Sequence, residues 1–293
     1  MRILITGAIG MLGSTLVQMW QDKYSVYATD IRGCENNPAQ NFLTFDLSAE
    51  SYDDLFLWAK PDIVIHCAAI TNVDYCEDHV DLAMEVNSES VNKLLQSGVR
   101  QIFISSDAVF PDGVRLSKET DKVSPENIYG ISKAAGEKYI LDAGEPNCVV
   151  RTTIVGKNIN PIVHGFVEWI VHTVKRGEEI TLFDDAFFTP ITIWQLAEEL
   201  EWIINNPIDG IIHIVGKEVM SKYHFGYSIC AKLGLDVSLI KMDTIHKVDF
   251  KAKRSLDQTL DASYYETYSS RKLPTGRRTI SQIVEFFRGG DDG

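Results

Sequence analysis

The stretch that decides the fold is Arg2-Ile3-Leu4-Ile5-Thr6-Gly7-Ala8-Ile9-Gly10-Met11-Leu12-Gly13, at the start of the chain. Its apolar first part predicts a strand over 2–6, and helical spacing predicts a helix over 11–20. Between them, Gly7 permits a tight turn, Gly10 lets the backbone approach a pyrophosphate, and Gly13 lets helix and strand pack closely. The helix N-terminus would bind the anion. A plain strand-to-helix turn is the alternative, but the position of the glycines favours a dinucleotide site.

Outward from this stretch, apolar runs alternate with helical patterns. Strands are predicted at 24–29, 42–45, 62–67, 101–106 and 148–152, and helices at 51–59, 81–97 and 129–143. Strands that are apolar throughout are typical of a parallel sheet covered on both faces. We therefore predict an α/β fold, a Rossmann-type doubly wound parallel sheet.

The alternation of predicted strands and helices becomes less regular after about residue 155. Helices are predicted at 162–176, at 192–204 with Thr192 as N-cap, at 222–233 with Gly234 ending it, and at 279–287. A strand is predicted at 211–215. The segment 241–278 is polar with little periodicity, and a frayed tail is predicted at 289–293. We expect a dinucleotide domain over 1–155, with later crossings around 189–215, and a smaller C-terminal substrate-binding lobe over 156–293.

Three residues carry candidate chemistry. Ser106 ends a predicted strand, and Tyr129 and Lys133 are four apart at the start of a predicted helix, so they share one face. A nearby ammonium favours the phenolate and lowers the pKa of a tyrosine, which makes it a proton donor. A serine hydroxyl can bind the oxygen that receives the proton. These three groups suit reduction of a carbonyl or oxidation of an alcohol. The Tyr-x-x-x-Lys pattern alone is also typical of an ordinary pair on a helix surface.

Asp30 closes the second predicted strand, where an acid accepts hydrogen bonds from the adenosine ribose. A carboxylate there repels a 2′-phosphate, so NAD is favoured over NADP. Arg32 could instead bind that phosphate, which leaves NADP open. Asp46 and Leu47 are expected near the adenine, with a helix cap as the alternative reading.

Together, the glycine loop, Ser106, Tyr129 and Lys133 resemble the extended short-chain dehydrogenase/reductase family. Further segments look like dTDP-4-dehydrorhamnose reductase and its relatives: 66–74, Val86-Asn87, 105–110, 151–153, Thr189-Pro190, Arg254, Leu260-Asp261 and Leu273-Pro274. The resemblance implies NAD(P)H-dependent reduction of a nucleotide-activated 4-keto-6-deoxy sugar. In that reaction Tyr129 donates the proton, Lys133 lowers its pKa and binds the nicotinamide ribose, and Ser106 binds the reacting oxygen. The implied cofactor-binding residues are Gly7, Ile9, Gly10, Met11, Leu12, Asp30, Ile31, Arg32, Asp46, Leu47, Cys67, Ala68, Ala69, Thr71, Tyr129 and Lys133.

Departures from the family pattern concern the substrate. Ala108 stands where the related dehydratases have an acid, so dehydration lacks its catalyst, and Asp107 and Phe110 do not match the epimerases. Reductases of the rhamnose pathway have Tyr at the position of Ala108 and Trp at that of Ile154, which implies a roomier pocket here. The expected substrate-binding residues are Asp107, Ala108, Ile154 and Arg254, with Arg254 as a candidate for the diphosphate.

Two alternatives remain at this point. One is an epimerase on the same scaffold that uses bound NAD catalytically. The other is a non-catalytic regulatory subunit, because the β subunit of methionine adenosyltransferase belongs to the same family. A homodimer is a family expectation.

Charge, apolar runs and cysteines limit the partners, the cellular location and the metal sites that we expect for this protein. The formal net charge of -13 argues against a nucleic-acid partner. No apolar run is long enough to span a bilayer, and the N-terminus shows no h-region, so we expect a cytoplasmic protein. Five cysteines without a C-x-x-C pair are interpreted as reduced thiols with no metal site. The acids around residues 74–81 are interpreted as a solvated loop and helix start.

Overall fold

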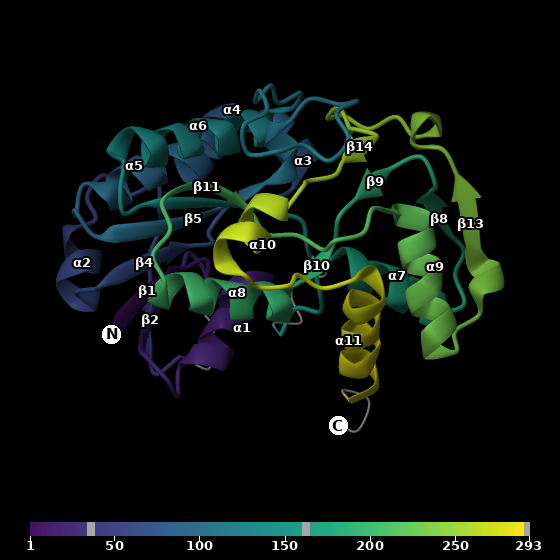
Figure 1. Cartoon of the computed structure of the whole chain (residues 1–293), viewed down its shortest axis with the longest axis horizontal. Coiled ribbons are helices and arrows are strands. Elements are labelled where there is room, and N and C mark those ends of the chain that lie inside the picture. Colours follow the sequence, from purple (N-terminus) through teal and green to yellow (C-terminus); the bar gives the residue numbers. More distant parts are fainter. Residues whose placement is uncertain (34–38, 160–164, 290–293) are drawn as a thin grey trace.

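A seven-stranded sheet forms the larger part of the molecule (Figure 1). In this computed structural model, residues 1–33, 39–159 and 165–289 are described. All neighbouring strands of the sheet are parallel. In spatial order they are β11 (Gly210–His213), β6 (Cys148–Thr152), β5 (Arg100–Ser106), β4 (Ile63–His66), β1 (Arg2–Thr6), β2 (Ser25–Asp30) and β3 (Asn41–Thr44). The predicted doubly wound parallel sheet is confirmed.

Helices cover both faces of this sheet, as its apolar strands require. On one face, α1 (Met11–Trp20) and α8 (Ile193–Asn205) pack on the side chains of Ile3, Ile5 and Ile212, with Tyr265 of α10 (Ser263–Ser269) beside them. On the other face, α2 (Asp53–Ala59), α5 (Ser90–Leu95) and α6 (Ile128–Ala143) cover the alternate residues of the same strands. Figure 1 shows α4–α6 above the sheet and α1 and α8 below it.

The glycine loop has the predicted form. Gly7 lies at φ 67°, and a Cβ on it would approach the Ala68 backbone nitrogen to 2.6 Å. A Cβ on Gly13 would lie 2.2 Å from the Gly7 carbonyl oxygen. Only glycine therefore allows β1, α1 and the chain after β4 to meet this closely.

The predicted helix over 81–97 is more complex in the structure. It consists of α4 (Val80–Met84), a π-helical turn η1 (Glu85–Glu89) and α5. The interpretation of residues 74–81 as a solvated loop and helix start is only partly right, because α3 (Val73–Asp78) also forms there. Asp74 and Asp78 pair with Arg254 and Lys251, so these acids fasten α3 to a late segment of the chain.

A second group of elements lies beside the sheet. It contains the helices α7 (Phe166–Lys175), α9 (Lys222–Leu233) and α11 (Gly276–Gly289), which share a buried cluster that includes Val171, Phe225 and Ile283. Short strands complete it: β8 (Ile180–Phe183) with β13 (Ile240–Asp243); β12 (Met220–Ser221), β9 (Phe187–Phe188) and β14 (Asp257–Gln258); and β10 (Ile191–Thr192) with β7 (Ile154–Val155). Thr192 caps α8 and Gly234 ends α9 in the left-handed conformation, as predicted.

Several smaller predictions have mixed outcomes. The segment 241–278 is not without regular structure, because it contains β13, β14 and α10. The start of the helix predicted over 162–176 lies outside the described residues, as do residues 290–293 of the predicted tail. Gly289, the first residue of that predicted tail, is instead the last residue of α11. The strand β11 lies between α8 and α9 in the sequence and pairs with β6 in the large sheet. The division into a domain over 1–155 and a lobe over 156–293 stays a prediction.

Further observations concern cysteines, membrane and metal. Cys67, Cys76, Cys148 and Cys230 are free thiols, and Cys34 lies outside the described residues. None of the described helices is long and apolar enough to cross a membrane. Within the described ranges, no cluster of three or more His, Cys, Asp or Glu side chains has the arrangement of a metal site.

Candidate active site

A cavity of about 660 Å³ opens at the carboxyl ends of the parallel strands. It lies where β1 and β4 are neighbours, with β2 and β3 on one side and β5 and β6 on the other. This reversal of strand order is the point at which open α/β sheets bind ligands. The volume is in the usual range for a cofactor or drug-sized ligand.

The predicted cofactor residues gather at one end of this cavity. The lining includes Gly7, Gly10, Met11, Leu12, Asp30, Ile31, Arg32, Asp46, Leu47, Cys67, Ala68, Ala69 and Thr71. Ile9 is the exception. It belongs to the glycine loop, but its side chain is buried and does not line the cavity. At Gly7 and Gly13 a side chain would clash with neighbouring backbone, so the loop stays free of side chains there. Such a loop at a helix N-terminus fits the pyrophosphate of a dinucleotide.

Asp30 organises this end of the cavity. One carboxylate oxygen accepts a hydrogen bond from the Ile9 amide at 3.1 Å, and the other accepts one from the Arg32 amide at 3.2 Å. The Arg32 guanidinium lies 3.6 Å from the same carboxylate, with its side chain 47% exposed. Asp46 lines the cavity and also accepts from the Ser48 amide. The reading of Asp46 as a helix cap is wrong, because α2 begins at Asp53 after Tyr52, and its place near the adenine stays a prediction.

Asn87 holds the loop after β4, a role that the sequence did not reveal. Its side chain accepts from the Ile70 amide at 2.7 Å and donates to the Ile70 carbonyl at 3.1 Å. It also donates to Ser132 Oγ of α6 at 2.9 Å. Asn87 lies in the π-helical turn η1, and such turns are frequent at functional sites. One buried amide therefore ties the cofactor loop to the helix that carries Tyr129 and Lys133.

Ser106, Tyr129 and Lys133 all line the other part of the same cavity. Ser106 is the last residue of β5, and Tyr129 and Lys133 lie on the first turns of α6. A Cβ on Gly130 would lie 2.2 Å from the Ala108 carbonyl oxygen, so α6 approaches the end of β5 as closely as backbone allows. That approach brings the phenol beside the serine.

The pKa of Tyr129 contradicts one expectation. The sequence predicted that Lys133 lowers it, whereas burial raises the pKa of Tyr129 to about 12 and a hydrogen bond with Ser106 offsets only part of the rise. Lys133 is buried as well. Its side chain is 2% exposed, its Nζ lies 3.9 Å from the Phe103 ring centroid, and burial lowers its pKa to about 7. Only the hydrogen bond with Ser106 lowers the pKa of Tyr129, so the burial of the phenol dominates.

Asp107 and Thr153 surround Ser106. Ser106 Oγ donates to Asp107 Oδ1 at 2.8 Å and accepts from the Ala108 amide at 3.2 Å. Thr153 Oγ1 donates to Asp107 Oδ2 at 2.6 Å. Burial raises the pKa of Asp107, and these hydrogen bonds oppose the rise. Each oxygen of the carboxylate thus already accepts from a hydroxyl.

Of the four expected substrate residues, two line the cavity. Asp107 and Ile154 do so, whereas Ala108 is buried behind Ser106 and Arg254 is absent from the lining. Arg254 Nη2 donates to Asp74 Oδ2 at 2.7 Å instead. Arg254 therefore fastens α3 to the late segment in this structure. The sequence missed Lys222 and Gln258, which do line the cavity.

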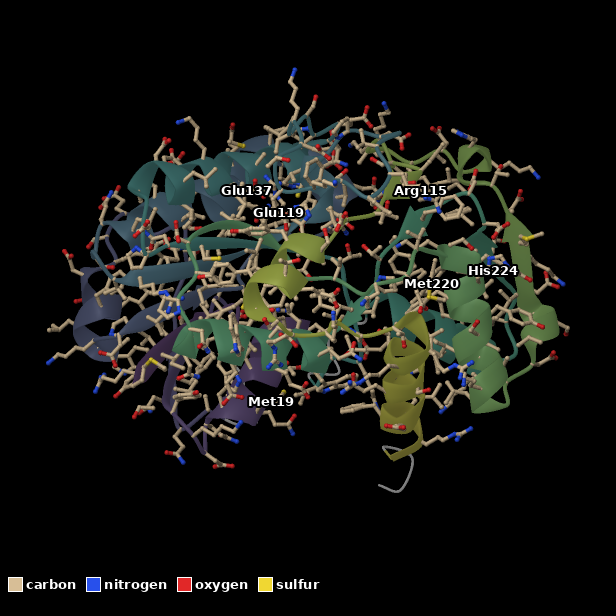
Figure 2. All side chains as sticks on the ribbon, viewed as in Figure 1. Met19, Arg115, Glu119, Glu137, Met220 and His224 are labelled. Atoms are coloured by element: carbon tan, nitrogen blue, oxygen red, sulfur yellow. The ribbon has the colours of Figure 1, made fainter. Side chains whose placement is uncertain are left out.

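A buried ion pair fixes the end of β5 from behind. Arg151 donates to both carboxylate oxygens of Glu137 at 2.9 and 2.6 Å, and Ser105 Oγ donates to the same carboxylate at 2.5 Å. His213 contacts Arg151 through its ring, and its amide donates to Glu119. Figure 2 labels Glu137 and Glu119 near each other. Since Ser105 precedes Ser106 and Glu137 follows Lys133 by one turn, the network aligns the end of β5 with the first turns of α6.

Comparison with known proteins agrees with this geometry. The family model described as "RmlD substrate binding domain" matches residues 1–288. The chain belongs to the RmlD family. The match spans almost the whole chain, so the predicted family is confirmed.

Individual known proteins match the chain over most of their length. The probable low-salt glycan biosynthesis reductase Agl14 of Haloferax volcanii is 27% identical, with 98% of each chain covered. The methionine adenosyltransferase 2 subunit beta of Bos taurus is 28% identical over 96% of this chain and 85% of its own. The crystal structure of a dTDP-4-dehydrorhamnose reductase from Clostridium acetobutylicum has a TM-score of 0.87 at 27% identity and covers 98% of this chain and 100% of its own. The expected NAD(P)-dependent oxidoreductase of the short-chain dehydrogenase/reductase type is confirmed at the level of the family.

Proposed function

We propose that this protein uses NADH or NADPH to reduce the keto group of a nucleotide-activated 4-keto-6-deoxy sugar. The observation that carries the proposal is that Ser106, Tyr129 and Lys133 line the same cavity as the glycine loop. Relatives named dTDP-4-dehydrorhamnose reductase support the substrate class. Asp30 at the end of β2 favours NADH, and the neighbouring Arg32 leaves NADPH open.

Tyr129 is the proposed proton donor. When bound, the reduced nicotinamide supplies the hydride that the carbonyl carbon receives. With a pKa of about 12, Tyr129 keeps its proton at neutral pH until a more basic alkoxide develops beside it. The carbonyl oxygen then takes the phenolic proton, and the tyrosinate is reprotonated from solvent. Positioned proton transfer of this kind contributes about 10²–10⁴-fold to a rate.

Lys133 and Ser106 support this transfer. As Tyr129 becomes negative, the adjacent amine gains affinity for its own proton, so a group with a pKa of about 7 supplies positive charge when it is needed. Ser106 Oγ donates its proton to Asp107 in this structure. Rotation of the hydroxyl would direct that proton to the substrate oxygen, while the Ala108 amide continues to hold Oγ in place.

A panel of substrates tests the proposal. The dTDP-, UDP-, GDP- and CDP-linked 4-keto-6-deoxy sugars are each mixed with the protein and NADH or NADPH, and nicotinamide absorbance is followed. We expect net oxidation of the nicotinamide with at least one sugar. If NADH binds and no member of the panel is reduced, the proposal is wrong.

One observation favours a second candidate, a regulatory subunit. The beta subunit of methionine adenosyltransferase 2 is as similar to this chain as the named reductases are. Co-purification of a stoichiometric larger enzyme, together with no turnover on the panel, would support this candidate. Turnover on the panel would make it unnecessary.

A further inference from the structure

Lys222 is a cation of the cavity to which neither the sequence patterns nor the proposed reaction assigns a role. It is the first residue of α9 and lines the cavity together with Asp107, Thr153 and Gln258. Its backbone is fixed, because its amide donates to the Ala186 carbonyl at 2.9 Å and the preceding residues Met220 and Ser221 pair with β9. Figure 2 labels Met220 and His224, which flank Lys222 in sequence, at the start of α9.

Two aromatic rings hold the side chain. Lys222 Nζ lies 3.6 Å from the Phe188 ring centroid and 5.0 Å from that of Phe166. Phe188 is 1% exposed and packs edge-on against Phe225, so the ring below the ammonium cannot move aside easily. Cation–π contact at this range stabilises the charged form and orients it.

The hydrogen-bonding capacity of this ammonium is unused. In the described parts of the chain, no atom forms a hydrogen bond or close ion pair with Lys222 Nζ. Asp107 is its charged neighbour, but the Asp107 oxygens already accept from Ser106 and Thr153. An ammonium has three N–H donors, and rings satisfy them poorly. Burial lowers the pKa of Lys222 to about 8, which leaves it largely charged at neutral pH.

The other cations of the lining are committed elsewhere. Within the described residues, the cationic side chains of the cavity wall are Arg32, Lys133 and Lys222. Arg32 pairs with Asp30 at the cofactor end, and Lys133 lies beside Tyr129. Arg254, the expected diphosphate ligand, is bound to Asp74. Lys222 is thus the cation left for the substrate end of the described wall.

From this arrangement we infer that Lys222 binds an oxyanion of the substrate and thereby sets which substrates the cavity accepts. The inference rests on the proposed function, because it takes the ligand of this end to be a nucleotide sugar. Two sources can supply the oxyanion. One is a phosphate of the nucleoside diphosphate, which the proposed 6-deoxy sugar substrate carries; the other is a carboxylate on the sugar ring, which would make the substrate a uronate in place of a 6-deoxy sugar. Both are hydrogen-bond acceptors of the kind that an ammonium binds as a point charge.

The test measures binding of dTDP, UDP, UDP-glucose and UDP-glucuronate by calorimetry, with NADH saturating. Wild type is compared with Lys222→Met and Lys222→Arg, and with Lys232→Met as a control at the exposed far end of the same helix. We expect Lys222→Met to weaken binding of anionic probes by about 10–100-fold, the usual size for a hydrogen bond to a charged group. Lys222→Arg should keep most of the affinity, and the control should match wild type. Unchanged NADH affinity and melting temperature show that the variants are folded.

The pattern across probes identifies the source. A phosphate contact weakens all four probes by a similar factor, whereas a ring carboxylate contact weakens UDP-glucuronate and leaves UDP-glucose unchanged. Equal affinities of wild type and Lys222→Met for all four probes, or no binding of any probe by wild type, would overturn the inference. Failure of the proposed function looks different: no keto-sugar is reduced, although Lys222→Met still changes the affinity for the probes.

Discussion

The two ends of the cavity are built in different ways. The cofactor end comes from consecutive strand-to-helix connections, namely 6–13, 30–32, 46–48 and 67–71, and much of its geometry is fixed by backbone. The substrate end combines the end of β5 with Thr153, Lys222 and Gln258, which are far apart in the sequence. The cofactor end can be recognised in the sequence, because its residues lie in short motifs at the ends of predicted strands. The substrate end depends on long-range packing and is free to vary between relatives.

This difference separates binding from chemistry. The glycine loop, Asp30 and the loop held by Asn87 can bind a dinucleotide with or without a reaction. Ser106, Tyr129 and Lys133 line the same cavity, and in the proposed reaction they convert binding into reduction. Variants that damage one end and spare the other therefore test the division.

The largest expected effect is on the chemical step. Tyr129→Phe removes the proposed proton donor and keeps the ring, so kcat should fall by about 10²–10⁴-fold. The dissociation constant for NADH, measured by fluorescence titration, should stay within about twofold because the glycine loop is untouched. A variant that keeps substantial kcat would show that another group donates the proton.

Gly7→Ala should damage the cofactor end. The new Cβ would lie 2.6 Å from Ala68 backbone atoms at a residue with φ 67°, so the loop must shift. We expect a loss of about 2–4 kcal/mol, divided between NADH binding and the free energy of unfolding.

Gly98→Ala is the matched control for this substitution. Gly98 has φ 71° and no neighbour within 4 Å of its would-be Cβ, so only the backbone penalty of about 1–2 kcal/mol applies. NADH titration and urea unfolding measure both variants. Equal losses would mean that the close approach of Ala68 does not matter.

Lys133→Met tests the point where the two ends meet. Burial lowers the pKa of Lys133 from 10.5 to about 7, so the folded state holds its proton less well than the unfolded state does. That penalty is full below a pH of about 7 and disappears as the pH rises to 10.5. Lys133→Met should therefore stabilise the protein at low pH, by up to about 5 kcal/mol, and abolish turnover.

Urea unfolding across this pH range measures the gain, and Lys138→Met, at an exposed position of the same helix, is the control. The advantage of Lys133→Met over wild type should shrink toward pH 10.5, while the control shows no such trend. A destabilised Lys133→Met at every pH would mean that the charge is better compensated than the structure indicates.

The same contrast explains what the sequence revealed. β1 and α1 begin and end where the pattern of 2–20 predicted, because local periodicity and glycines define them. The strands β9, β12 and β14 have two residues each and are defined by pairing with one another, such as Met220 with Phe188. They are too short to show a hydrophobic period in the sequence. A lysine at a helix start, such as Lys222, is typical of a surface in sequence, and only the fold places it in a cavity. The pKa of Tyr129 was predicted wrongly because burial is a property of the folded molecule.

The most direct test follows a deuterium atom from the cofactor. NADH or NADPH carrying deuterium at the transferred position is incubated with the protein and the keto-sugar that the panel identifies, and the product is analysed by mass spectrometry. The structure predicts an alcohol that carries deuterium at the former carbonyl carbon, formed with equimolar oxidation of the cofactor and nearly absent with Tyr129→Phe. A product without deuterium and without net cofactor oxidation would contradict reduction and indicate epimerisation.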